Sequence, residues 1–425
     1  MLIASAACRL SRINQGTLRK GTAAYRRASL AMFLAGFSTF SLLYWPQALL
    51  PLIARTWAVT PAAASTLIAL GTLAMAVMLI PASLLSDRFG RKNVMSLAML
   101  LAALFTLAMA FVTSFHALLI LRFMTGLVLA GLPAVAMTYL SEEVESGALA
   151  SAIGLYISGT AFGGMSGRLL SAWAAAVWGS AGAALVIGIA GLLAATCFLY
   201  GLPASQKFRS RLLPLSREGR EAWRLALLQL LRDPVLRVLW AMGFLFLGCF
   251  VGLYNFIGFR LERPPFSWGP LALGSVFLLY VFGGAASAVS GRMARRWGLV
   301  PALQAMWLTL MLGVLCTLSD SRLLLLTGMA LFTLAFFAGH ALASSAVGLR
   351  AQGHQALAAA MYLCSYYAGA SVLGPLLGWA WHAQQWPAVV AVLMVASVIG
   401  LRLTSRLGQP GILHYAYAAF NKGLP

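Results

Sequence analysis

Apolar and polar positions alternate along this chain in long blocks. Long runs with almost no charged residues are separated by short polar stretches. An α-helix needs about 20 apolar residues to cross the hydrocarbon core of a bilayer, so we expect each run to be a membrane-spanning helix. Twelve spans can be drawn, at residues 28–53, 62–85, 94–113, 116–140, 150–177, 180–202, 238–259, 270–291, 301–318, 322–347, 356–381 and 387–405. The prolines within these runs are candidate kink sites: Pro46, Pro81, Pro133 and Pro375.

A polar segment divides the spans into two groups of six. We therefore predict a tail at 1–27, a six-helix bundle at 28–202, a linker at 203–237, a second bundle at 238–405 and a tail at 406–425. The linker holds a stretch from Arg220 to Asp233 with Trp223, Leu227, Leu230 and Leu231 on one face and bases on the other. That pattern predicts an amphipathic helix in the membrane interface, and a plain tether is the alternative.

The two groups of spans also resemble each other. Thr125 and Gly126 in the fourth span match Thr327 and Gly328 in the tenth, and the loop 291–298 takes the place of the loop 83–90. Six plus six spans with matched loops indicate internal repeats. In transporters built from repeats, the substrate site lies near the bilayer midplane between them.

Composition and charge agree with this pattern. Of 425 residues, 61% are hydrophobic and 9% are charged, which favours a polytopic helical membrane protein over a soluble one. The net charge is +21, but 24 of the bases fall on one predicted side of the membrane and four on the other. The positive-inside rule then predicts cytoplasmic termini, and the bases face lipid and not nucleic acid. Five cysteines lie singly, so we expect neither a metal site nor a cofactor.

Two arginines and one histidine lie well inside spans. Arg122 either faces the bundle interior or extends outward to the membrane surface. For Arg168, packing against backbone carbonyls and contact with substrate both remain open. His340 is either a proton-coupling group or a hydrogen-bonded packing residue. No span contains a clear Asp or Glu, which argues against a cationic substrate and favours an anionic or neutral polar one.

The loop between the second and third spans concentrates charge. The stretch SLLSDRFGRK holds Asp87 where one helix is predicted to end and Arg91 with Lys92 where the next begins. This order is opposite to the preference of the helix dipole, so we expect partners elsewhere in the bundle. Glu142 and Glu143 end the fourth span on the same membrane face. The alternative is that the bases only mark the cytoplasmic side.

These residues carry a resemblance to a known family. SLLSDRFGRK is similar to the signature loop of the major facilitator superfamily, with Ser83 where the family usually has glycine. Further motifs that resemble the family are Leu121, Arg122, Thr125, Gly126 and Gly131 in the fourth span, the repeat Gly159, Gly163 and Gly167 in the fifth, which lacks the usual proline, and Gly374, Pro375 and Gly378 in the eleventh. The resemblance covers roughly residues 25–405 and is nearest to bacterial inner-membrane permeases of the drug-efflux-like, proton-antiporter type.

The resemblance implies an all-α fold of twelve helices in two pseudo-symmetric bundles, which works by alternating access. It implies a cytoplasmic gate, with Asp87 meeting the start of the eleventh span; we assign to this gate Asp87, Arg88, Gly90, Arg91, Lys92, Glu142 and Glu143. The cavity-lining spans and their neighbours supply candidates for a substrate or proton pathway: Gln47, Arg122, Thr138, Asn255, His340 and Tyr366. We assign close helix packing to five glycines: Gly159, Gly163, Gly167, Gly374 and Gly378. The first span departs from the efflux pattern, because it offers Tyr44 and Gln47 in place of an acid.

The function expected is secondary transport of a small organic solute, with proton-coupled export as the leading hypothesis. Proton symport or facilitated uptake of a polar or anionic metabolite, such as a sugar or organic acid, is the alternative. A non-transporting membrane sensor is a remote alternative. An enzyme is not expected, because clustered His, Asp or Ser residues are missing. We expect a monomer in the cell inner membrane, whose partners are the lipid bilayer, the solute and protons.

Overall fold

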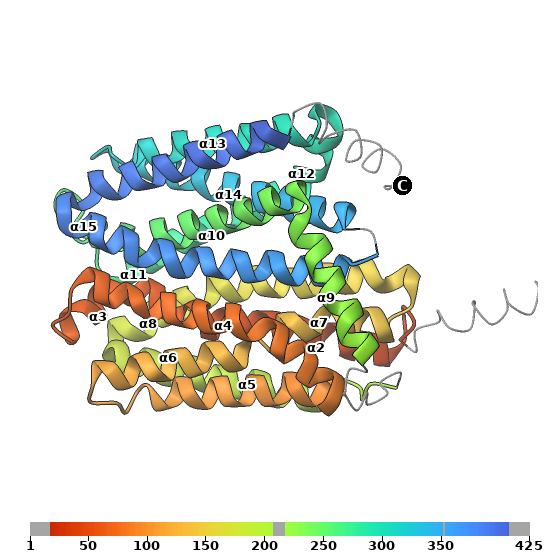
Figure 1. Cartoon of the computed structure of the whole chain (residues 1–425). Coiled ribbons are helices and arrows are strands. Elements are labelled where there is room, and N and C mark those ends of the chain that lie inside the picture. The colour runs from red at the N-terminus through yellow and green to blue at the C-terminus, as the bar shows by residue number, and fades with distance from the viewer. Residues whose placement is uncertain (1–17, 207–216, 352, 408–425) are drawn as a thin grey trace, which may run out of the picture.

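The chain folds into a bundle of long helices (Figure 1). The structure, a computed structural model, describes residues 18–206, 217–351 and 353–407, and this part of the chain contains no β-strand. Its helices are α2 (Ala23–Tyr44), η1 (Trp45–Leu49), α3 (Leu50–Thr56), α4 (Pro61–Phe89), α5 (Arg91–Ala108), α6 (Phe115–Leu129), α7 (Pro133–Glu143), α8 (Ser146–Gly201), α9 (Arg217–Arg232), α10 (Pro234–Leu261), α11 (Pro270–Ser275), η2 (Val276–Leu279), α12 (Tyr280–Trp297), α13 (Leu299–Cys316), α14 (Arg322–Arg350) and α15 (Gln355–Leu407).

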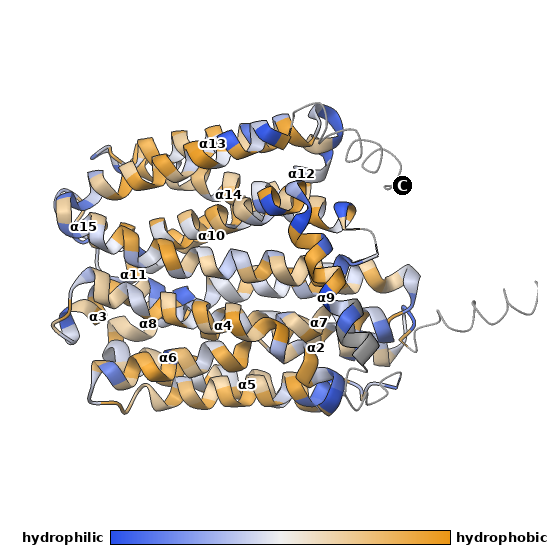
Figure 2. Cartoon of the chain, in the orientation of Figure 1, coloured by the Kyte–Doolittle hydropathy of each residue, from blue (hydrophilic) through white to orange (hydrophobic). Residues whose placement is uncertain are grey.

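Within the described residues, ten helical stretches are long and apolar enough to cross a membrane. Two of them, α8 and α15, contain 56 and 53 residues, and each is interrupted by non-helical backbone, at Gly179 in α8 and at Gln384 and Gln385 in α15. Figure 1 shows α15 doubling back on itself. Divided at these residues, α8 and α15 correspond to the two pairs of spans predicted there. The apolar residues cover the helical rods, and the hydrophilic ones gather at the ends of the rods (Figure 2).

Two of the four predicted proline kinks interrupt helices. Pro46 lies in the 3₁₀ turn η1 between α2 and α3, and Pro133 begins α7 after the break that follows α6. Pro81 and Pro375 lie inside the helices α4 and α15, where the kinks stay a prediction. A proline removes one backbone hydrogen bond within a helix, so both positions remain candidate kink sites.

Glycines bring α8 and α2 into close contact. A Cβ atom at Gly159 would lie 2.2 Å from the carbonyl oxygen of Phe33, and one at Gly163 would lie 2.0 Å from that of Phe37. At Gly167 it would lie 2.4 Å from the Ser41 hydroxyl. Small residues allow such close approach of helices within a membrane.

The second half repeats this arrangement between α10 and α15. A Cβ atom at Gly369 would lie 1.9 Å from the carbonyl oxygen of Phe244. Gly378 packs against the other half, because a Cβ atom placed on it would lie 2.7 Å from Ala62 Cα. Gly374 differs from the prediction, because its nearest neighbours would be at 3.7 Å and 3.8 Å, an ordinary contact distance. The close-packing glycine that the sequence did not single out is Gly369.

The matched loops of the two halves have the same backbone turn. Gly90 separates α4 from α5 with φ of 93°, and Gly298 separates α12 from α13 with φ of 87°. Positive φ favours glycine, so both loops require it. The internal repeat therefore extends to the geometry of these turns.

The two ends of the bundle are distinct. Figure 1 places α9 at one end, which we call the linker end, and α3 with the turn of α15 at the other, which we call the opposite end. The predicted linker helix is present as α9; Leu230 is buried, whereas Trp223 and Leu231 are exposed. Part of the apolar face of α9 is therefore buried against the protein, and part of it is exposed. Positions 207–216 of the predicted linker, 1–17 of the first tail and 408–425 of the second tail lie outside the described residues.

Candidate functional site

Arg122 on α6 is completely buried, so it does not extend to the membrane surface. Each of its nitrogen atoms donates to a backbone carbonyl: Nε to Leu67 at 3.1 Å, Nη1 to Leu42 at 3.0 Å and Nη2 to Leu43 at 2.5 Å. The last two acceptors lie near the end of α2, where Pro46 has no N–H to offer the carbonyl of Leu42. The carbonyl ends of a helix also favour positive charge. Arg122 therefore joins α2, α4 and α6.

Glycines make room for this arginine. A Cβ atom at Gly71 on α4 would lie 3.0 Å from Arg122 Nη2, and a Cβ atom at Gly126 would lie 2.1 Å from the carbonyl oxygen of Gly71. The glycine of the Thr-Gly pair in the fourth span is thus explained by close contact between α6 and α4.

Arg168 on α8 is the second buried arginine, and its side chain is surrounded by neutral groups. Its Nε and Nη2 both donate to Gln47 Oε1, at 2.8 Å and 2.5 Å, and its Nη1 donates to the carbonyl of Gly164 at 2.5 Å. Three aromatic rings lie within cation–π distance of its Cζ atom: Tyr44 at 4.6 Å, Phe277 at 4.8 Å and Tyr280 at 5.2 Å. Residues of both halves therefore surround this guanidinium.

Gln47 connects Arg168 to the second half. Its Nε2 donates to Asn255 Oδ1 at 2.7 Å and to the carbonyl of Val251 at 3.1 Å, both on α10. The resulting chain, Arg168–Gln47–Asn255, is buried throughout. We call these three residues the interhalf bridge. The sequence proposed Gln47 and Asn255 as pathway residues, and the structure adds Arg168, whose role the sequence left open.

Several polar atoms around the interhalf bridge have no hydrogen-bond partner. Asn255 Nδ2, the Tyr44 hydroxyl and the Tyr280 hydroxyl are all buried and unpartnered among the described residues. Buried polar groups in proteins are nearly always hydrogen-bonded, and exceptions point to function or to an absent partner. This cluster is the candidate substrate site.

His340 and Tyr366 lie together in the second half. His340 Nδ1 is 2.9 Å from the Tyr362 hydroxyl, and the imidazole is tilted against the ring of Tyr366, with ring centroids 4.5 Å apart. Phe336 stacks on the same imidazole at 6.0 Å. These contacts describe a hydrogen-bonded histidine in an aromatic cluster, which is the packing alternative of the sequence prediction.

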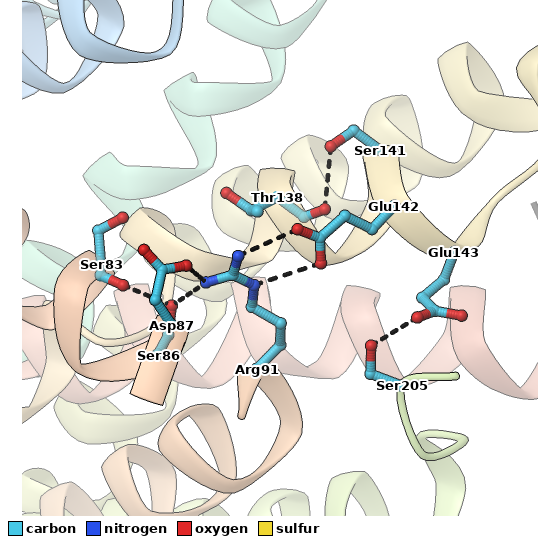
Figure 3. A network of polar contacts seen from close by, with 9 residues as sticks. All are labelled: Ser83, Ser86, Asp87, Arg91, Thr138, Ser141, Glu142, Glu143 and Ser205. Atoms are coloured by element: carbon cyan, nitrogen blue, oxygen red, sulfur yellow. Dashed lines mark hydrogen bonds and ion pairs between the residues drawn. The ribbon is translucent and has the colours of Figure 1, made fainter. Parts of the chain in front are cut away.

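The charged loop at the linker end forms an ion-pair network (Figure 3). Arg91 donates to Glu142, with Nη2 to Oε1 at 3.0 Å and Nε to Oε2 at 3.3 Å. Its Nη1 lies 2.5 Å from Asp87 Oδ1 and from Ser86 Oγ. Thr138 lies here as well, and its carbonyl accepts from Ser141. The network therefore joins α4, α5 and α7 of one half, and Thr138 is not part of the interhalf bridge.

Two of the expected partners at this end differ, those of Asp87 and Lys92. The ion pair of Asp87 is with Arg91 in the same loop and not with the start of the eleventh span. Lys92 Nζ donates to the carbonyl of Leu202 at 2.6 Å, and Glu143 Oε1 accepts from the Ser205 hydroxyl at 2.5 Å. Both residues hold the segment that follows α8, because that segment returns past α5 and α7. Arg88 lies over the ring of Phe89.

Other contacts between the halves lie from the middle of the bundle to the opposite end. Near the middle, Cys364 Sγ donates to the carbonyl of Ala76 at 3.3 Å. Farther along, Thr72 Oγ1 is 2.9 Å from Ser371 Oγ. Arg55 forms an ion pair with Glu262 at the opposite end. These pairs could not be predicted from the sequence, because single Thr, Ser and Cys residues and loop charges do not reveal a partner in the other half.

The described residues include no group of three or more His, Cys, Asp or Glu that could hold a metal ion.

Comparison with known proteins gives a consistent result. Residues 28–351 match the model of the Major Facilitator Superfamily. The inner membrane transport protein YnfM of Escherichia coli (strain K12) is 40% identical over 397 residues, which cover 92% of this chain and 93% of that protein. An MFS-type transporter of Bacillus subtilis (strain 168) is 39% identical over 392 residues, which cover 92% and 96%.

Two shorter matches and one structure add to this. A 4-hydroxybenzoate transporter of Pseudomonas putida is 31% identical over a stretch that covers 42% of this chain and 39% of that protein. A niacin transporter of Acinetobacter baylyi is 37% identical over a stretch that covers 22% of this chain and 21% of that protein. A bacterial homologue of the human lysosomal transporter Spinster, in an inward-facing and occupied conformation, has a TM-score of 0.71 at 15% identity, covering 94% and 97%. At this identity the likeness concerns the fold alone.

Replacing Arg122 by Leu should destabilise the protein. The change leaves three buried carbonyls without their donor, and each unsatisfied group costs about 1–3 kcal/mol. We expect a loss of more than about 3 kcal/mol in the free energy of unfolding, measured by denaturant in detergent micelles. Arg55→Leu is the control, because its side chain is 56% exposed and should change stability by less than about 1 kcal/mol. Wild-type stability of Arg122→Leu would contradict the structural role.

Proposed function

This chain belongs to the Major Facilitator Superfamily, and from that premise we propose that it carries a small organic solute across the bilayer by alternating access between its two halves. The family and the relatives are transporters and not enzymes, and their similarity supports secondary transport. The all-α fold expected from the sequence is confirmed by the family match and by the solved structures. The solute, the direction and the coupling belong to the proposal.

One observation carries the mechanism: the contacts between the halves described above lie between the middle and the opposite end. They are the interhalf bridge and the pairs Ala76–Cys364, Thr72–Ser371 and Arg55–Glu262. At the linker end, the ion pairs Arg91–Glu142 and Arg350–Asp233 each lie within one half. We propose that this state is closed at the opposite end and that transport requires these interhalf contacts to separate.

The charged loop is proposed to act when the linker end closes. Asp87 then leaves Arg91 and meets the start of α15, as the family resemblance implies. Exposed ion pairs contribute about 0–1 kcal/mol, so the exchange biases two conformations without locking either. We propose further that the linker end and both termini face the cytoplasm and that the membrane is the inner membrane. The relative in Escherichia coli is an inner membrane protein, which supports this location.

For direction, we propose proton-coupled export of the solute. The close packing of Gly159, Gly163 and Gly167 onto α2 supports it, because this repeat resembles that of antiporters. Symport or facilitated uptake is the second candidate. It is favoured by the positions of the nine acidic residues, which all lie in loops, in the linker or at helix ends, away from Arg122 and Arg168.

A cross-link between Thr72 and Ser371 should stop transport. In a variant without native cysteines, Thr72→Cys with Ser371→Cys holds the halves together once the thiols are bridged. We expect solute flux into proteoliposomes to fall at least about tenfold on bridging and to return on reduction. Each single cysteine variant is the control for labelling alone. Full flux with the bridge in place would refute alternating access through this contact.

Asp87→Asn should slow transport while the protein remains stable. The carboxylate at a helix N-terminus is worth about 0.3–1 kcal/mol, so we expect a two- to fivefold lower rate, roughly. Unfolding should change by less than about 1 kcal/mol, because Asp87 is partly exposed and the Arg91–Glu142 pair remains. Asp320→Asn, in an exposed pair with Arg260 at the opposite end, is the matched control. An unchanged turnover in Asp87→Asn would rule out the gate.

An imposed pH gradient should decide the coupling. In proteoliposomes, proton-coupled export predicts that solute moves against the direction of proton flow and that a protonophore abolishes its accumulation. The solute is the one that a thermal-shift screen of sugars, organic acids and antimicrobials selects. Solute flux in the same direction as proton flow would show symport. Solute flux that does not change with the pH gradient would show facilitated diffusion.

A further inference from the structure

We propose that the guanidinium of Arg168 binds the carboxylate of a small aromatic acid, and that the side-chain amide of Gln47 takes the place of that carboxylate in the structure. The inference rests on the proposed transport function and names the substrate class of the same site. It assigns a role to Arg168 that the sequence alone leaves open.

The first argument is the charge of the site. Arg168 is 2% exposed, and its described partners are an amide oxygen, a backbone carbonyl and aromatic rings, all of them neutral. A buried charge is costly unless an opposite charge accompanies it, and charges inside membrane proteins usually mark a substrate or ion pathway. Since no acidic residue of the sequence lies mid-span, an anionic ligand is the group that would neutralise Arg168.

The two buried arginines differ in this respect. Arg122 donates from all three nitrogen atoms to backbone carbonyls, two of them at the end of α2. Arg168 donates to a single backbone carbonyl, and its remaining donors meet a side chain that can move. Arg122 is therefore a structural group, whereas Arg168 has a face that a ligand can take.

The second argument is the geometry of that face. Nε and Nη2 of Arg168 lie along one edge of the guanidinium, and both donate to the same oxygen, Gln47 Oε1. A carboxylate meets this edge with two oxygen atoms in parallel, and such charge-assisted bonds are about twice as strong as neutral ones. A substrate carboxylate would therefore displace the Gln47 amide from Arg168.

The third argument is the set of unpartnered atoms. Asn255 Nδ2, the Tyr44 hydroxyl and the Tyr280 hydroxyl are buried without a hydrogen bond, and both tyrosine rings lie beside Arg168. Together they offer donors and acceptors to polar groups of a ligand. Phe277 completes an aromatic wall against which a planar ring can stack. The partial relatives transport 4-hydroxybenzoate and niacin, which are both aromatic carboxylates, and this agrees with the chemistry of the wall.

The interhalf bridge links ligand binding to the opposite end. Gln47 uses its oxygen for Arg168 and its nitrogen for Asn255 and Val251 of the other half. When a carboxylate displaces the oxygen, one anchor of the bridge is released. Binding of the anion and separation of the halves are then coupled, and each favours the other. Removing the amide of Gln47 should for the same reason strengthen anion binding.

The test measures binding of 4-hydroxybenzoate to the purified full-length protein by titration calorimetry. 4-Hydroxybenzamide, the neutral analogue, and cyclohexanecarboxylate, which lacks the aromatic ring, are the comparison ligands. We expect 4-hydroxybenzoate to bind at least about tenfold more tightly than the amide, because the carboxylate makes charge-assisted bonds to Arg168 that the neutral amide cannot make. Equal affinity for acid and amide, or tighter binding of cyclohexanecarboxylate than of 4-hydroxybenzoate, would overturn the proposal.

Variants identify the binding group. Arg168→Gln should abolish binding, and Arg168→Lys should weaken it about tenfold, since an ammonium cannot make the parallel pair of bonds. Gln47→Ala should bind several times more tightly, a gain that a merely structural residue would not give. Arg322→Gln, an exposed residue at the start of α14, is the control and should leave the affinity unchanged. Undiminished binding by folded Arg168→Lys, or weaker binding by Gln47→Ala, would refute the assignment.

The outcome is separable from the proposed function. If the Thr72–Ser371 cross-link stops the flux of some solute while no aromatic acid binds, alternating access stands and the substrate class is wrong. If 4-hydroxybenzoate binds through Arg168 but no flux responds to the cross-link, the site is correct and the transport mechanism is wrong.

Discussion

Two positive charges lie inside an apolar bundle, and the rest of the structure depends on how each is satisfied. Arg122 is held by carbonyls that Pro46 and the end of α2 leave open, so it fixes α6 against α2 and α4. Arg168 is held by Gln47, whose other end reaches the second half. Arg122 therefore stabilises the packing of one half, whereas Arg168 connects the two halves at a place where a ligand can bind.

Much of the fold follows from the sequence, because a bilayer demands long apolar helices and internal hydrogen bonding. The predicted spans 150–177 and 180–202 meet at Gly179, where α8 breaks. The turns at Gly90 and Gly298 could be matched from the letters alone, and both have positive φ. Pro46 and Pro133 lie where helices are interrupted, whereas Pro81 and Pro375 lie inside helices, and the sequence alone does not distinguish the two cases.

The candidate site was predictable only in part. Gln47 and Asn255 stood out as polar groups in apolar spans, and the structure joins them. Tyr44 and Tyr280 could be noticed only as hydroxyls in or near the spans, because a sequence does not show that a buried hydroxyl lacks a partner. Lys92 and Glu143 carry charges that suggest a gate, and each also bonds to the segment after α8, a contact that charge alone does not predict. Pairings between distant segments depend on three-dimensional packing, which spacing in the sequence does not encode.

The glycine contacts have a mechanical consequence. At Gly159, Gly163 and Gly167 the backbone of α8 touches α2 without intervening side chains, and Gly369 does the same between α15 and α10. Side chains can repack when helices slide, but backbone in direct contact has little freedom to do so. Each pair should therefore tilt as one rigid body, so that the flexibility of the transport cycle is confined to the surface between the pairs.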